Sequence, residues 1–210
     1  MRWLLILLGC VVAAVPLSIH VAGAAGQQRA YVPFVIKDSR AACPTSSQLI
    51  LNPGFEDAFP GNATGWSTAG LGPGAARTSS RARNGAYSWQ GPSAGQQSLY
   101  QYFEVPQWAE RGALYFSWYM ESAEPSSEFH DQLWVLLPDG PSGGGYSRTI
   151  TNTAARDTWT DERVELSSIQ ALRGVNESIQ LKFTEDADGK PTTFWVDDVR
   201  LVVTCGNLTP

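Results

Sequence analysis

The segment Ala113–Glu121 alternates apolar and polar side chains with a period of two residues. This period is that of a β-strand that buries one face and exposes the other. The side chains expected to face a core are Leu114, Phe116, Trp118 and Met120, and those expected on the opposite face are Tyr115, Ser117, Tyr119 and Glu121. A chain with such a strand has to build a sheet and cover one side of it.

The rest of the sequence extends the same pattern. The chain has 210 residues, with 20 Gly, 13 Pro and only 17% charged residues, a composition typical of many short strands joined by turns in one all-β domain. Asn84-Gly85 marks a tight turn, residues 138–145 a long loop, and residues 167–173 a short helix or turn. The further predicted strands are 49–57, 98–105, 132–137, 159–166, 178–184 and 193–203.

The first 25 residues carry one basic residue, an apolar run and a small-residue ending. This order predicts a secretory signal peptide cut near Ala24 or Ala25, and therefore a secreted or cell-surface protein. The alternative is an uncleaved membrane anchor, which Pro16 and His20 disfavour because they interrupt the apolar run. Residues 26–46 are predicted to form an extended segment, in which the role of Tyr31–Lys37 stays open, and residues 47–205 to form the β-domain.

The charge of the predicted mature chain excludes two classes of partner. Removing residues 1–25 leaves 14 basic and 20 acidic residues, a net charge of −6. Such a surface is a poor partner for nucleic acid or for anionic lipid.

Short motifs at the two ends of the β-domain point to a family. Asn52-Pro-Gly-Phe-Glu56 lies near its start and Trp195-Val-Asp-Asp-Val199 near its end, with Gly65-Trp66 and Asn84-Gly85 between them. In this order the motifs resemble those of family 4/9 carbohydrate-binding modules, in the galactose-binding-like superfamily, over Ser47–Val203. The resemblance implies a jelly-roll β-sandwich of two antiparallel sheets that recognises a glycan without catalysing a reaction.

The same resemblance implies a structural Ca²⁺ ion where the first and last strands meet. The residues that would hold it are Glu56, Asp197 and Asp198. Carboxylate oxygens suit this hard cation, and its charge would offset their mutual repulsion. The alternative is three ordinary surface carboxylates.

Two cysteines remain after Cys10 leaves with the predicted signal peptide. Cys43 and Cys205 form an even pair in an oxidising compartment and flank the domain. The antiparallel first and last strands that the resemblance implies would place the two at the same end, so a disulfide between them is expected. Two unpaired cysteines are the alternative, because register cannot be read from sequence.

Aromatic residues supply the candidate ligand site. If the two strands are neighbours, Tyr115, Tyr119 and Trp134 lie on the face away from the core, with Gln132 and Glu121 beside them. Flat rings edged by hydrogen-bonding groups suit the apolar faces of sugar rings. Three aromatics at loop ends are further candidates: Trp66, Trp89 and Tyr146. The alternative is a sheet surface that carries aromatic residues without binding sugar.

Two motifs that suggest other chemistry fail on their context. Gly91-Pro-Ser-Ala-Gly95 matches a hydrolase nucleophile elbow, but a strand-like segment follows it where the elbow needs a helix. The segment Asp186–Lys190 has the Asp-x-Asp-Gly of a calcium loop, but the closing Glu position falls on Trp195, so we expect a hairpin turn. The expected function is thus non-catalytic glycan or polysaccharide binding. The alternative is a structural module at the cell surface that binds another protein.

Overall fold

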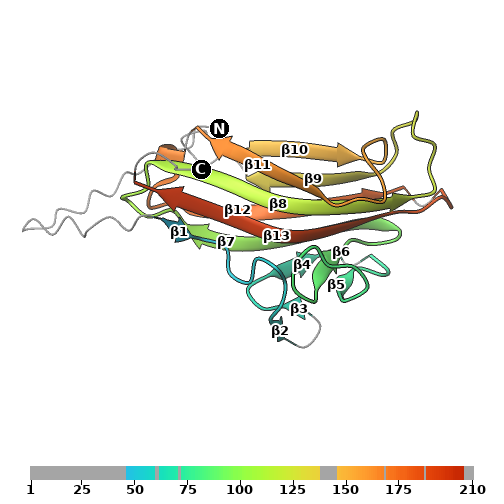
Figure 1. Cartoon of the computed structure of the whole chain (residues 1–210), viewed down its shortest axis with the longest axis horizontal. Helices are drawn as coiled ribbons and strands as arrows, with labels where there is room; N and C mark the ends of the chain where they lie inside the picture. Colours follow the sequence, from blue (N-terminus) through green and yellow to red (C-terminus); the bar gives the residue numbers. More distant parts are fainter. Residues whose placement is uncertain are drawn as a thin grey trace, which may run out of the picture. The chain divides into compact units, whose positions relative to one another are not determined.

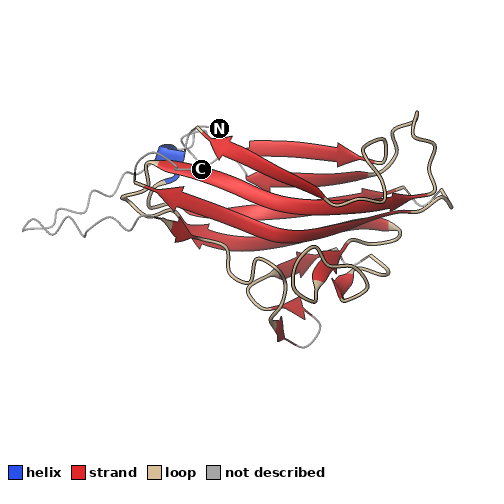
Figure 2. Cartoon of the chain, in the orientation of Figure 1, coloured by secondary structure: helices blue, strands red, loops and turns tan. Residues whose placement is uncertain are grey.

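The computed structural model describes residues 46–59, 62–70, 72–137, 146–167, 169–186 and 188–205. Their regular secondary structure is almost all β-strand, arranged mainly as two antiparallel sheets that pack face to face (Figure 1). Helix in the described part is limited to the 3-10 turn η1, Ile169–Leu172 (Figure 2). The structure therefore confirms an all-β sandwich of two antiparallel sheets.

The first sheet, here called sheet I, follows the order β11-β8-β13-β6-β5, and β1 also pairs with β13. All of its pairs are antiparallel. Its strands are β1 (Ser47–Gln48), β5 (Ala76–Thr78), β6 (Ser88–Gln90), β8 (Arg111–Ser122), β11 (Thr160–Leu166) and β13 (Thr192–Thr204).

The second sheet, sheet II, follows the order β10-β9-β12-β7-β4 and is also antiparallel throughout. Its strands are β4 (Ser67–Ala69), β7 (Gly95–Glu104), β9 (Gln132–Leu137), β10 (Tyr146–Thr151) and β12 (Asn176–Glu185). A small separate pair is formed by β2 (Ala58–Phe59) and β3 (Asn62–Ala63).

The core lies between the two sheets and is built from alternate residues of each strand. In β8 the predicted inward residues are all buried in it, as are the inward residues of β9. Burial of such side chains contributes about 1.5 to 3 kcal/mol each relative to exposure. They are Leu114, Phe116, Trp118 and Met120 of β8, and Leu133, Val135 and Leu137 of β9.

Two of the connections that cross from one sheet to the other bear on the sequence predictions. β8 belongs to sheet I and β9 to sheet II, so the two strands are not neighbours and the condition for grouping Tyr115, Tyr119 and Trp134 on one face is not met. β12 belongs to sheet II and β13 to sheet I, so Asp186–Lys190 joins two sheets and is not a hairpin turn. A connection rich in turn residues has the same composition whether it closes a hairpin or crosses between sheets. The pairing of the strands on either side is set by contacts with residues far away in the sequence.

The predicted first strand, residues 49–57, is also shorter than expected. β1 ends at Gln48, although the backbone N–H of Leu49 still donates to the carbonyl of Leu201 in β13 at 2.8 Å. After that the chain bends, and both Asn52 and Phe55 have positive φ angles, 47° and 57°. Pro53 and Gly54 between them favour a turn over a ladder, because proline lacks an N–H donor and glycine carries no side chain.

Several predictions fall outside the described residues. These are the signal peptide, the extended segment up to residue 45 with Tyr31–Lys37, Cys43, and the loop at residues 138–145. In the part of the chain that the structure describes, no helix is long and apolar enough to cross a membrane.

Candidate functional site

Three aromatic side chains point outward from sheet II. Tyr100 and Tyr102 come from β7, where Leu99, Gln101 and Phe103 alternate with them and are buried. The Tyr100 and Tyr102 rings lie 5.7 Å apart, edge to face, and Tyr102 is 64% exposed.

The third ring, Trp134, is on β9 between the buried residues Leu133 and Val135. Its position follows from the same period-two alternation, which turns it away from the core.

Polar side chains lie beside these rings through the cross-strand register. Lys182 of β12 is opposite Trp134, and its Nζ lies 5.7 Å from the Trp134 ring centroid. Gln180, also on β12, is opposite both Leu136 and Tyr100. The indole N–H of Trp134 donates to the Gln132 side chain. The outward face of sheet II therefore combines flat apolar rings with amide and ammonium donors.

A hollow of about 240 Å³ adjoins this face on the side of β4. It is lined by Ala69, Gly70, Gln96, Gln97, Ser98 and Lys182. Lys182 thus borders both the hollow and the Trp134 ring. This arrangement offers a ring surface for stacking and polar groups for hydrogen bonds, the combination that orients small polar ligands.

The other predicted ligand residues lie on sheet I, so the structure does not bring the five together. Tyr119 is only 7% exposed, because Trp159 and Trp195 pack against its ring and the Arg81 guanidinium lies 4.0 Å from the ring centroid. Arg81 also forms an ion pair with Glu121. Tyr119 and Glu121 therefore have partners within the chain, and neither presents a free platform.

Tyr115 also points outward from β8, on the same sheet. The guanidinium of Arg200 lies 5.2 Å and that of Arg163 lies 5.8 Å from its ring centroid. Arg163 Nε donates to the Tyr115 hydroxyl at 3.2 Å. Two cations close to the ring leave less of it for a sugar.

Of the loop-end aromatics, Trp66 and Trp89 are core residues. Both are buried, and both pack against Phe55 with ring centroids 5.3 and 6.3 Å away. Tyr146 is half-buried against the same core. None of the three forms an open platform.

Tyr100 and Tyr102 are the functional candidates that the sequence reasoning did not select. The alternation of residues 98–105 already places both on the outward face. What the sequence lacks is the pairing of β12 with both β7 and β9, which brings them onto the same face as Trp134.

The predicted calcium residues meet at the corner where the turn after β1 approaches β13. Glu56 Oε1 accepts hydrogen bonds from the backbone N–H groups of Ala86 and Tyr87, both at 3.0 Å. Asn84 donates from its side chain to Asp198. Gly85, at a φ of +65°, leaves room for Glu56, whose Oε1 would lie 2.3 Å from a β-carbon there.

Asp197 is the buried member of this corner, with no exposed surface. Its Oδ2 accepts from the backbone N–H of Arg83 at 2.8 Å and of Asn84 at 3.2 Å, and its Oδ1 from the N–H of Asp198 at 2.7 Å. Burial raises the pKa of Asp197 to about 6, although these hydrogen bonds oppose the shift.

This geometry does not resemble a cage of carboxylates around an ion. In the described residues, Glu56, Asp197 and Asp198 do not form a group whose oxygens all lie within 4.8 Å of one another. Backbone donors already hold Glu56 and Asp197 in place without a cation. Calcium at this corner stays a prediction, and no further step is derived from it.

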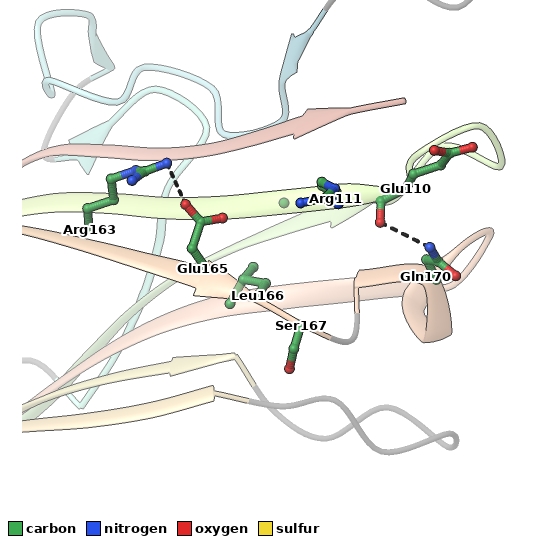
Figure 3. Close-up of a pocket in the computed structure, with 8 residues that line it drawn as sticks. Glu110, Arg111, Arg163, Glu165, Leu166, Ser167 and Gln170 are labelled. Carbon is green, nitrogen blue, oxygen red and sulfur yellow. Dashed lines mark hydrogen bonds and ion pairs between the residues drawn. The ribbon is translucent and has the colours of Figure 1, made fainter. Parts of the chain in front are cut away.

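A cavity of about 400 Å³ lies beside the start of β8 and the end of β11 (Figure 3). Arg163 and Glu165 form an ion pair beside it, and the Gln170 side chain donates to the Glu110 carbonyl at 3.2 Å. Its lining contains no aromatic ring. It is therefore a weaker candidate for a sugar site than the outward face of sheet II.

Comparison with known proteins supports the fold. No protein-family model matches the sequence, and no curated protein matches it. Among solved structures, a family 61 carbohydrate-binding module in complex with beta-1,4-galactotriose has a TM-score of 0.55 at 18% identity, over 74% of this chain and 98% of that one.

Two further similar structures are cyclases. The Stig cyclase Fisc from Fischerella sp. TAU has a TM-score of 0.52 at 14% identity, over 77% of this chain and 100% of that one. An apo cyclase from Fischerella sp. has a TM-score of 0.51 at 15% identity, over 78% and 99%. At these identities the likeness shows a shared β-sandwich fold alone.

Proposed function

We propose that this chain is a non-catalytic, carbohydrate-binding-like module that recognises a polysaccharide on the outward face of sheet II. One observation carries the proposal: the rings of Trp134, Tyr100 and Tyr102 all point outward from the β9-β12-β7 part of this sheet. Sugar rings would stack on them, and Gln132, Gln180 and Lys182 would donate hydrogen bonds to hydroxyl groups.

The acidic residues of this face support binding without hydrolysis. Along the described strands of sheet II, the outward-facing positions carry a single carboxylate, Glu104 of β7. Glycoside hydrolysis usually needs a pair of carboxylates on either side of the scissile bond. The face therefore has the character of a binding surface.

Replacing Trp134 by alanine is expected to weaken polysaccharide binding at least about tenfold, because one stacking ring often contributes most of the energy at such a site. The measurement is affinity electrophoresis in gels that contain soluble β-1,4-galactan, xylan or mixed-linkage glucan. Tyr100→Ala should weaken binding as well. Tyr115→Ala is the matched control, since it removes an aromatic ring from the outward face of the opposite sheet.

The wild-type chain should be retarded by at least one of these polysaccharides, and Tyr115→Ala should be retarded equally. Loss of binding in Tyr115→Ala with none in Trp134→Ala would transfer the site to sheet I. If no polysaccharide retards the wild type, the face is better explained as a contact surface for a cell-surface protein.

We further propose that the protein is secreted and that Cys43 and Cys205 form a disulfide. Ser47 is paired with Val203 in antiparallel register; in the sequence Cys43 comes shortly before Ser47 and Cys205 shortly after Val203. The expected result is that non-reducing mass spectrometry of a protease digest links the two cysteine peptides. A thiol reagent that labels both cysteines in the unreduced chain would contradict the pairing.

A further inference from the structure

Two of the connections that cross between the sheets meet at one end of the sandwich, on the right in Figure 1. One joins β8 to β9 and the other joins β12 to β13. The backbone N–H of Ala123 donates to the carbonyl of Pro191 at 3.1 Å, and the hydroxyls of Ser122 and Thr192 are 2.7 Å apart. Residues far apart in sequence are thereby brought together.

These connections gather carboxylates into two groups that share Asp186. In each group, one oxygen from every member lies within 4.8 Å of those of the others. The first group is Glu124, Asp186 and Asp188, and the second is Asp131, Glu185 and Asp186.

Two of these carboxylates are buried and carry oxygen atoms without a hydrogen-bond partner. Glu124 is 2% exposed, and neither of its carboxylate oxygens has a hydrogen-bond partner. Asp131 is fully buried; its Oδ1 accepts from the N–H of Asp186 at 3.0 Å, but its Oδ2 has no partner. Buried carboxylates without partners are strongly unfavourable, so a compensating charge is expected here.

Two basic side chains lie close to these carboxylates. His130 lies 3.1 Å from Asp186, 3.2 Å from Glu128 and 3.9 Å from the Glu124 Oε2 atom. The ammonium of Lys190 lies 3.5 Å from Asp188.

Arg156 is also close, but it directs its guanidinium to backbone carbonyls. It donates to the carbonyl of Glu124 at 2.7 Å and to that of Asn152 at 2.7 Å. It therefore fixes the backbone of the β8–β9 connection and leaves the Glu124 carboxylate without a hydrogen bond.

We propose that these inter-sheet connections form a divalent-cation site for Ca²⁺, with Glu124, Asp186 and Asp188 as its central ligands and Asp131 beside them. Calcium takes oxygen ligands at about 2.3 to 2.6 Å, so two ligands of one ion lie at most about 5 Å apart. The 4.8 Å limit that the three oxygens satisfy is within that span. The cation ties the two connections together across the end of the sandwich.

The site is separate from the corner of Glu56 and Asp197. There, backbone N–H groups satisfy the carboxylates, whereas the oxygens of Glu124 have no such donors. The competing explanation is a proton: burial raises the pKa of Glu124 and the neighbouring Asp188 raises it further, so a shared proton would also relieve the repulsion.

Calorimetric titration of CaCl₂ into the full chain, stripped with chelator at pH 7.5, tests the proposal. The wild type should bind Ca²⁺, and its thermal midpoint should rise by roughly 5 to 10 °C at a hundredfold excess over Kd. Glu124→Gln and Asp188→Asn keep side-chain shape and should each weaken this binding at least about tenfold, since each removes a ligand charge. Glu56→Gln is the matched control and should retain it.

Three outcomes overturn the site. The first is that the wild type binds no Ca²⁺. The second is that both Glu124→Gln and Asp188→Asn bind Ca²⁺ as the wild type does, and the third is that only Glu56→Gln loses binding. A midpoint that rises on acidification to pH 5 but does not respond to Ca²⁺ identifies the shared proton instead. Asp188 is partly exposed, so Asp188→Asn carries the test if Glu124→Gln does not fold.

Discussion

Replacing Phe55 by alanine is expected to lower the free energy of unfolding by about 3 to 5 kcal/mol, which is a large share of the stability of a domain of this size. Phe55 is fully buried in the turn after β1, and its ring packs 5.3 Å from that of Trp66 and 6.3 Å from that of Trp89. Alanine would leave a cavity between two large rings that other parts of the chain hold in place.

The measurement is urea denaturation followed by tryptophan fluorescence, with the midpoint and slope compared between variants. Phe129→Ala is the matched control, because Phe129 is 57% exposed and its truncation should change stability by less than about 0.5 kcal/mol. A loss below about 1 kcal/mol for Phe55→Ala would mean that the turn repacks and does not anchor the core.

Phe55 also shows what could be read from the sequence and what could not. The alternation of residues 113–121 and 132–137 predicted which side chains of β8 and β9 are buried, because the pleat makes this a local property. Residues 49–57 begin with a short apolar run closed by turn residues, a pattern that predicts a strand. The structure forms a turn there instead. The buried ring of this turn is that of Phe55, which contacts Trp66 and Trp89 further along the chain.

The direction of each side chain in the candidate site could be predicted from the sequence, but which of these side chains lie on the same sheet could not. The outward direction of Trp134 and of Tyr115 followed from alternation. Trp134 and Tyr115 would share a sheet if β8 and β9 formed a hairpin. The connection between them crosses from sheet I to sheet II instead, so Trp134 shares a sheet with Tyr100 and Tyr115 does not. The residues of this connection do not distinguish a hairpin from a crossing. Glu124 carried no sequence signal at all, because its environment is created by that crossing and by the one at Asp186.

Replacing Asp197 by alanine is expected to cost about 2 to 5 kcal/mol of stability, because it leaves backbone donors at Arg83, Asn84 and Asp198 without their acceptor. Asp197→Asn retains one acceptor oxygen but turns an amide N–H₂ group toward donors, so it should be destabilising by a smaller amount. Thermal unfolding of both variants in excess chelator measures these effects without any contribution from bound metal.

The two variants also test the buried charge of Asp197 through pH. Its pKa is about 6 in the folded chain, whereas an unfolded aspartate titrates near about 3.9. Between these values the folded state holds a proton that the unfolded state has released. The contribution of Asp197 is therefore fully present below about pH 4 and is lost as the pH rises through about 6.

The wild type should accordingly lose about 2 to 3 kcal/mol relative to Asp197→Asn between about pH 4 and pH 7, and nothing further at higher pH. Taking the difference between the two proteins removes the opposite contribution of Asp161, whose pKa the Arg83 guanidinium lowers in both. Parallel pH profiles would show that the three backbone hydrogen bonds outweigh burial and keep Asp197 ionised in the folded chain.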